Sequence, residues 1–163
     1  MPKVTVTLGS SRPGGLDISL AGLCAQTFDD FEVVFVDGRY HQRHQRVLEA
    51  VRESGLRQPF YHVPNHRYSD GPWGTNCAGY NTGFALAEGE LVVMLLDYAY
   101  APPGWLQAHV DHAGKLVMAG AEYRTLIGAY PDDGGRSLTE FTRADVDAVP
   151  FDGGPKLPRT NPG

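Results

Sequence analysis

Residues 91–97 read Leu-Val-Val-Met-Leu-Leu-Asp, an apolar run that ends in a single carboxylate, Asp97. A short continuous apolar run of this kind is typical of a strand buried on both faces of a parallel sheet. In an open α/β sheet, ligands bind just beyond the carboxyl ends of the strands. The stretch therefore predicts one strand of the fold and places Asp97 where a functional group is expected.

Strand and helix patterns alternate along the chain around this stretch. Strand patterns cover residues 3–8, 31–36, 59–63, 91–97 and 115–120. Helical spacing of apolar residues covers 16–26, 42–53, 75–87 and a stretch that begins near residue 103. The alternation predicts an α/β fold with a mostly parallel, Rossmann-like sheet and helices on both faces. We expect one domain over residues 1–128 and a short, loop-rich C-terminal extension over 129–163, which is rich in proline and glycine.

Composition limits the classes of function. The chain has 163 residues and a formal net charge of −5, which argues against a nucleic-acid-binding protein. Arg39, Arg43 and Arg46 are expected to form one solvated helix face. No apolar stretch approaches the roughly 18 residues of a membrane span, and the N-terminus does not resemble a signal peptide, so we expect a cytoplasmic protein. Cys24 and Cys77 fall in predicted helices, and we expect them to be buried free thiols.

Polar residues follow three of the predicted strands. Ser10, Ser11 and Arg12 follow the first strand, Asp37 follows the second, and Asp97 ends the fourth. Because the carboxyl ends of parallel strands meet at one edge of the sheet, we expect these residues to converge. A carboxylate after the second strand is placed to accept hydrogen bonds from a ribose or a base, although Asp-Gly is also a common turn.

Four ordered blocks of the sequence resemble family 2 glycosyltransferases of the GT-A fold. The blocks cover residues 4–28, 31–37 and 81–90, and Asp97 with Pro-Pro-Gly-Trp-Leu at 102–106. The resemblance covers residues 3–124. It implies transfer of a sugar from a nucleotide-sugar donor to an acceptor, usually with inversion. It also implies a divalent metal, Mg²⁺ or Mn²⁺, on the donor diphosphate and an Asp or Glu as base.

The resemblance assigns donor-binding residues one by one. Asp37 matches the nucleoside-binding Asp of the family, and Asp97 matches the first Asp of its metal-binding Asp-x-Asp motif. Ser11 and Arg12 match the polar loop beside the nucleotide. Asn81 matches the Asn of the family block Ala-Arg-Asn-x-Gly.

The chain departs from the family at three positions. Gly38 stands where the family has a second donor-site acid, and Tyr80 replaces the Arg before Asn81, where its ring could stack on a base. Ala99 replaces the metal-binding Asp two residues after Asp97. A diphosphate-bound Mg²⁺ or Mn²⁺ needs at least one or two carboxylates, so Asp97 alone would be a weak metal ligand. Either another cation such as the arginine of the first loop neutralises the diphosphate, or the site handles such a donor poorly.

The sequence fixes no catalytic base. Glu140 is the candidate among the acids downstream of Asp97, and the alternative is a solvated loop acid. Histidines spaced three apart at 41 and 44, and at 109 and 112, could bind zinc, but without further ligands we expect partly exposed helix residues.

The first hypothesis is a glycosyltransferase-like, inverting enzyme that binds a nucleotide-sugar and acts on an acceptor the sequence does not identify. The alternative is a non-catalytic GT-A-like binding or structural module, either a subunit of a larger assembly or a truncated enzyme, and either version could be a homo-oligomer. A dinucleotide-binding or receiver-type domain is a third interpretation. It is disfavoured because the Gly-x-Gly-x-x-Gly fingerprint is absent after the first strand.

Overall fold

The computed structural model describes residues 3–11, 14–65, 74–97, 99–113 and 122–123. The elements follow one another in the order β1 (Val4–Ser10), α1 (Leu16–Cys24), β2 (Phe31–Asp37), α2 (Tyr40–Ser54), β3 (Phe60–Pro64), α3 (Gly74–Leu86), β4 (Leu91–Leu96), β5 (Ala99–Tyr100), α4 (Trp105–Asp111) and β6 (Glu122–Tyr123). The predicted alternation is confirmed through α4, with ends that shift by a few residues.

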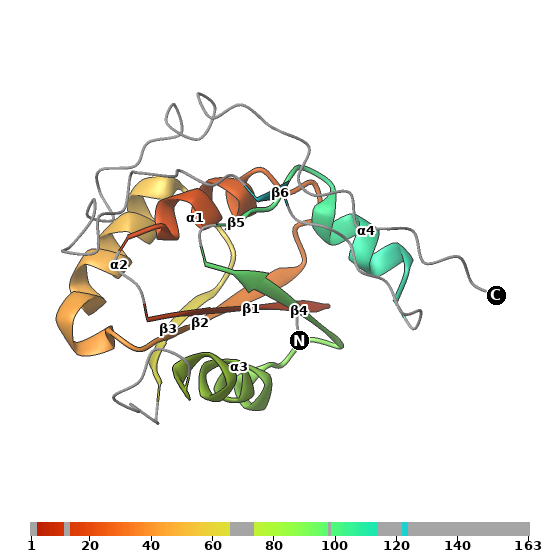
Figure 1. The fold of residues 1–163 in the computed structure, drawn as a ribbon. Helices are drawn as coiled ribbons and strands as arrows, with labels where there is room; N and C mark the ends of the chain where they lie inside the picture. Colours follow the sequence, from red (N-terminus) through yellow and green to blue (C-terminus); the bar gives the residue numbers. More distant parts are fainter. Residues whose placement is uncertain (1–2, 12–13, 66–73, 98, 114–121, 124–163) are drawn as a thin grey trace.

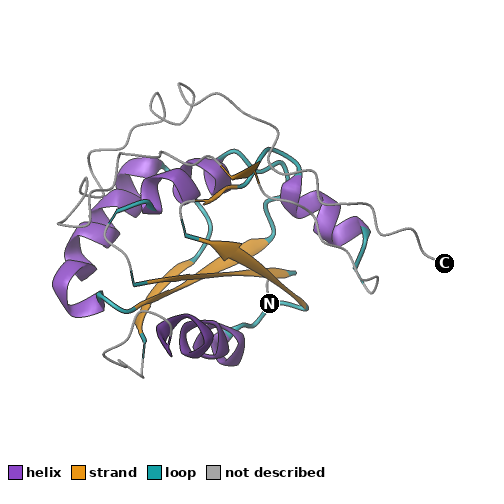
Figure 2. Cartoon of the chain, in the orientation of Figure 1, coloured by secondary structure: helices purple, strands orange, loops and turns teal. Residues whose placement is uncertain are grey.

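The main sheet is parallel and has the strand order β3-β2-β1-β4. Helices α1 and α2 cover one face of it and α3 covers the other (Figure 1). Figure 2 shows the same three layers by type of element. The predicted α/β class, a mostly parallel sheet between helices, is confirmed. The short strands β5 and β6 form a separate antiparallel pair.

The register of the strands brings their carboxyl ends together. Ser10 lies opposite Asp37 in the β1–β2 pair, and Gly9 lies opposite Leu96 in the β1–β4 pair. Asp37 in turn lies opposite Pro64 of β3. The residues that end or follow β1, β2 and β4 therefore share one edge of the sheet.

The largest apolar core lies between the sheet and helices α1 and α2. Every second residue of the central strands enters it, together with apolar residues of the helices: Val4, Val6, Leu8, Phe31, Val33, Phe35, Val93, Leu95, Leu16, Leu20, Leu23 and Val47. All seven residues of β2 are buried, which is the pattern of a strand covered on both faces. On the opposite face α3 packs closely, since a Cβ at Gly83 would lie 3.1 Å from Cγ2 of Thr7.

A buried carboxylate holds the connection between α3 and β4 to the sheet. The hydroxyl of Thr5 donates to Oε1 of Glu32 at 2.6 Å, and the backbone N–H of Glu88 donates to the same oxygen at 2.9 Å. The N–H of Gly89 donates to the Thr5 hydroxyl at 2.8 Å. Glu32 is 1% exposed, so these bonds provide the partners that a buried polar group requires.

The prediction that residues 91–97 form a strand buried on both faces is wrong for one face. Val92, Met94 and Leu96 are 38%, 47% and 40% exposed, whereas Val93 and Leu95 between them are buried. The reason is position. Among the described residues β4 pairs in the sheet only with β1, and α3 lies over β1 and β2.

Three smaller expectations also need correction. The helical pattern over residues 42–53 predicts that Leu48 faces inward, but Leu48 of α2 is 38% exposed. Both Cys24 and Cys77 are free but exposed rather than buried. The predicted strand at 115–120 and the extension at 129–163 lie outside the described residues. Within the part of the chain that is described, no helix is long and apolar enough to cross a membrane.

Candidate functional site

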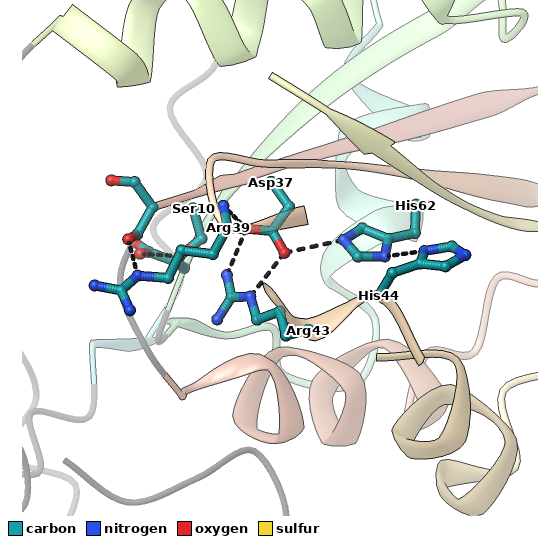
Figure 3. A network of polar contacts seen from close by, with 8 residues as sticks. Ser10, Asp37, Arg39, Arg43, His44 and His62 are labelled. Carbon is teal, nitrogen blue, oxygen red and sulfur yellow. Dashed lines mark hydrogen bonds and ion pairs between the residues drawn. The ribbon is translucent and has the colours of Figure 1, made fainter. Parts of the chain in front are cut away.

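Asp37 is the most strongly coordinated side chain at the carboxyl edge of the sheet (Figure 3). It is 1% exposed, although it ends a strand. The guanidinium of Arg43 donates to both carboxylate oxygens, from Nε at 2.7 Å and from Nη2 at 2.8 Å. The backbone N–H of Arg39 donates to Oδ1 at 2.7 Å, and Nε2 of His62 lies 2.9 Å from Oδ2. Both oxygens of Asp37 therefore have partners within the protein.

These partners decide the charge of Asp37. Burial is the largest influence and by itself raises the pKa of the carboxyl, because it disfavours the charged form. Hydrogen bonds from His62 and Arg43, the charge of Arg43 and the backbone N–H of Arg39 outweigh burial and hold the pKa of Asp37 below its ordinary value. The carboxylate is thus ionised at neutral pH.

His62 continues the network away from Asp37. Burial lowers the pKa of His62 and outweighs the effect of the nearby carboxylate, so the ring is neutral at pH 7. With its Nε2 proton directed to Asp37, Nδ1 of His62 accepts from Nδ1 of His44 at 2.9 Å. The ring of His62 also stacks on Phe35, with centroids 5.1 Å apart. Hydrogen bonds thus connect Asp37 of β2 through His62 of β3 to His44 of α2.

Arg43 corrects the expectation of a solvated arginine face on α2. Its side chain is 8% exposed and, like Val47 one turn later, it faces the sheet. The same turn of α2 carries Tyr40, whose ring lies 4.7 Å from that of His62. Sequence reasoning missed Arg43 and His62 as partners of Asp37. The available signal was an arginine at an inward helical position directly after a strand that ends in Asp.

Asp97 lies on the other side of β1 from Asp37. The hydroxyl of Ser10 donates to Oδ2 of Asp97 at 2.9 Å, and the carbonyl of Ser10 accepts from the N–H of Gly38 at 2.9 Å. The structure therefore brings together the three strand ends that the sequence predicted to converge. Asp97 is partly exposed, in contrast to Asp37.

Gly38 permits the close approach of the β1–α1 loop to the end of β2. A Cβ at Gly38 would lie 3.0 Å from Cβ of Ser11, which is tighter than ordinary contact. The following residue, Arg39, donates from Nε to the carbonyl of Ser11 at 2.8 Å. An acidic side chain at position 38 would have to displace this loop.

Tyr80 of α3 lies above the end of β1. A Cβ at Gly9 would be 3.7 Å from Cζ of Tyr80, so the ring covers a position without a side chain. Asn81 is exposed at the next position of the helix. Arg12 and Glu140 lie outside the described residues, so their predicted roles stay predictions.

The side chains that the structure describes do not fit a metal held by two carboxylates. Ala99 is 0% exposed and belongs to the apolar core, so the position two residues after Asp97 faces inward rather than toward the edge. In the described ranges no three His, Cys, Asp or Glu side chains cluster as metal ligands, the histidines of α2 and α4 included. Among the described residues a divalent cation would find one partly exposed carboxylate at this edge, Asp97, with a serine hydroxyl bound to it.

An open groove of about 890 Å³ lies at the other edge of the sheet. It is lined by residues at the ends of α1 and α2 and before β2 and β3, among them Cys24, Asp30, Ser54 and Pro59. The sequence singled out no chemistry there. The carboxyl edge is therefore the candidate site, and the groove is its competitor.

Two of three comparisons with known proteins found a match. A family model described as Glycosyl transferase family 2 matches residues 11–125. Among solved structures, the chain is similar to one described as S. aureus TarS residues 1–349 in complex with UDP, at 19% identity and a TM-score of 0.47. That match covers 72% of this chain and 38% of the TarS chain, so the chain spans well under half of the structure it matches. No curated protein sequence matches the chain.

Proposed function

Because the chain belongs to glycosyl transferase family 2, we propose that it binds a nucleotide-sugar donor at the carboxyl edge of its sheet and transfers the sugar to an acceptor hydroxyl. One observation carries the proposal. Three parallel strands bring Ser10, Asp37 and Asp97 to this edge, where a parallel sheet binds its ligands. In the proposed reaction the acceptor oxygen attacks the anomeric carbon opposite the diphosphate, which leaves with the electron pair, and a base takes the acceptor proton. The configuration is thereby inverted.

The geometry suggests different roles for the two aspartates. Asp97 is partly exposed and is the carboxylate that a ribose or sugar hydroxyl would reach. A ligand could hydrogen-bond the carboxylate of Asp37 only by displacing one of its present partners. Asp37 therefore acts on the donor chiefly by fixing the turn at Gly38 and Arg39. Tyr80 is placed for stacking on a base at the end of β1.

Calorimetric titration with UDP, GDP, CDP and dTDP, each with and without Mn²⁺, tests the proposal. We expect one of them to bind and Asp97→Asn to weaken that binding about 10- to 100-fold, since a hydrogen bond to a charged group contributes about 1.5–3 kcal/mol. Asp111→Asn, a change at an exposed residue of α4, is the matched control and should leave binding unchanged. If none of the four diphosphates binds, the donor site is not where we place it.

A non-catalytic module that keeps the fold is the second candidate function. It is favoured by the burial of Ala99 where a second carboxylate would be needed. The two functions differ in turnover. Mass spectrometry can detect nucleoside diphosphate released from UDP- and GDP-sugars. Such release would refute the hypothesis of a non-catalytic module, whereas binding without any release over many hours would support it.

A further inference from the structure

Arg39 is a cation held at the candidate site by both of its ends. Its backbone N–H is bound by Oδ1 of Asp37 at 2.7 Å, and its Nε donates to the carbonyl of Ser11 at 2.8 Å. Figure 3 shows the tip of the guanidinium pointing away from the Asp37 carboxylate. Its two terminal nitrogens have no partner among the described residues. The side chain is half-buried and is thus ordered before any ligand arrives.

Arg39 also balances a charge at this edge of the sheet. Arg43 and Asp37 neutralise each other in a buried pair, which leaves Asp97 and Arg39 as the charged groups of the network that remain among the described residues. Two carboxylates at this edge would need a divalent cation before a diphosphate could approach. Among the described residues outside the buried pair, one carboxylate is matched by one fixed arginine, so their formal charges cancel without such an ion.

We propose that Arg39 binds the diphosphate of the donor in place of a divalent metal; this inference rests on the proposed function. Three observations carry it. Ala99 is buried, so the position two residues after Asp97 supplies no second carboxylate to the edge. The guanidinium tip is fixed through Nε, and its two remaining nitrogens form a fork that matches two oxygens of a phosphoryl group. Helix α2 begins at the next residue, Tyr40, so the positive end of its dipole lies at the same place.

The test uses the whole chain, with inorganic pyrophosphate and the four nucleoside diphosphates UDP, GDP, CDP and dTDP as probes. Binding is measured by calorimetry in EDTA and again with Mn²⁺. We expect pyrophosphate and at least one nucleoside diphosphate to bind in EDTA, with affinities that Mn²⁺ changes by less than about threefold. We also expect the affinity to fall as salt rises, because the contact is ionic.

Two variants of Arg39 separate charge from geometry. Arg39→Met should weaken binding of pyrophosphate and of the diphosphate at least 10-fold while leaving the affinity for the corresponding nucleoside unchanged. Arg39→Lys keeps the charge but cannot form the same fork, so its affinity for both probes should lie between those of the wild type and Arg39→Met. Arg46→Met is the matched control on the exposed side of α2 and should bind like the wild type. Circular dichroism melts check that each variant is folded.

The outcomes distinguish this inference from the proposed function. Nucleoside diphosphate binding that requires Mn²⁺ and is unchanged in Arg39→Met would overturn the role of Arg39 and leave the donor site standing. Failure of every diphosphate and of pyrophosphate to bind, with or without Mn²⁺, would overturn both.

Discussion

Removing the Arg43 guanidinium should lower the free energy of unfolding of this domain substantially, because it would leave Asp37 charged and buried without its main partner. Arg43→Met keeps most of the buried stem but deletes the two hydrogen bonds, at 2.7 and 2.8 Å, to Asp37, which is 1% exposed in the wild type. Breaking a buried ion pair by removal of one partner costs about 3–5 kcal/mol. A domain of this size has a total stability of about 5–15 kcal/mol, so urea unfolding followed by circular dichroism would detect the loss easily.

The pH dependence of this loss gives a second signature. Without Arg43 the pKa of Asp37 rises, since burial is then opposed by fewer partners. The variant can relieve the buried charge by binding a proton, so its deficit against the wild type should narrow as the pH falls from 7 to about 4. Arg46→Met, at an exposed position of the same helix, should stay within about 0.5 kcal/mol of the wild type. A deficit for Arg43→Met below about 1 kcal/mol, flat with pH, would refute the reasoning.

Three further predictions concern stability. Gly22→Ala should lower the free energy of unfolding in a urea titration by about 1–3 kcal/mol, because the new Cβ would lie 2.5 Å from the backbone nitrogen of residue 101. Gly79→Ala, whose Cβ would make ordinary contacts, is the control and should be neutral or stabilising. Ala99→Asp buries a carboxylate in the apolar core, so it should lower the free energy of unfolding by about 2 kcal/mol or more. The variant should gain no Mn²⁺-dependent nucleotide binding. Such a gain would contradict the inward orientation of position 99. Because the pKa of His62 is lowered in the folded protein, the unfolded chain binds the proton at a higher pH than the folded one does. The neutral His62 ring therefore makes its full contribution to the free energy of unfolding above about pH 6.5, and this contribution falls as the pH drops below that value. His62→Gln, which can still donate to Asp37, should flatten that slope in melts from pH 7 to 5, and an unchanged slope would exclude His62 as its source.

The sequence predicted the architecture because the fold follows from local patterns. Alternating strand and helix periodicities require a parallel sheet with crossover helices, and the parallel sheet in turn requires the ends of β1, β2 and β4 to meet. The convergence of Ser10, Asp37 and Asp97 could therefore be predicted without a structure. The family resemblance over residues 3–124 agrees with the family match at 11–125.

The sequence could not predict what depends on the neighbours of each element. Exposure of Met94 depends on which segment lies beside β4, and this is not written in the apolar run itself. The burial of Arg43 depends on the rotation of α2 relative to the end of β2, and the contact of His62 depends on the β2–β3 register. For the same reason Asp37 could be located at the site but not recognised as a carboxylate already bound on both oxygens.

Mapping of the bound ligand on the chain tests the central claim most directly. Backbone amide spectra of the ¹⁵N-labelled protein, recorded with and without the nucleoside diphosphate that binds, report which residues change their surroundings. We expect the largest shifts at Ser10, Gly38, Arg39 and Asp97, at the carboxyl ends of β1, β2 and β4. Shifts confined to the groove at the opposite edge, around residues 54–59, would contradict it.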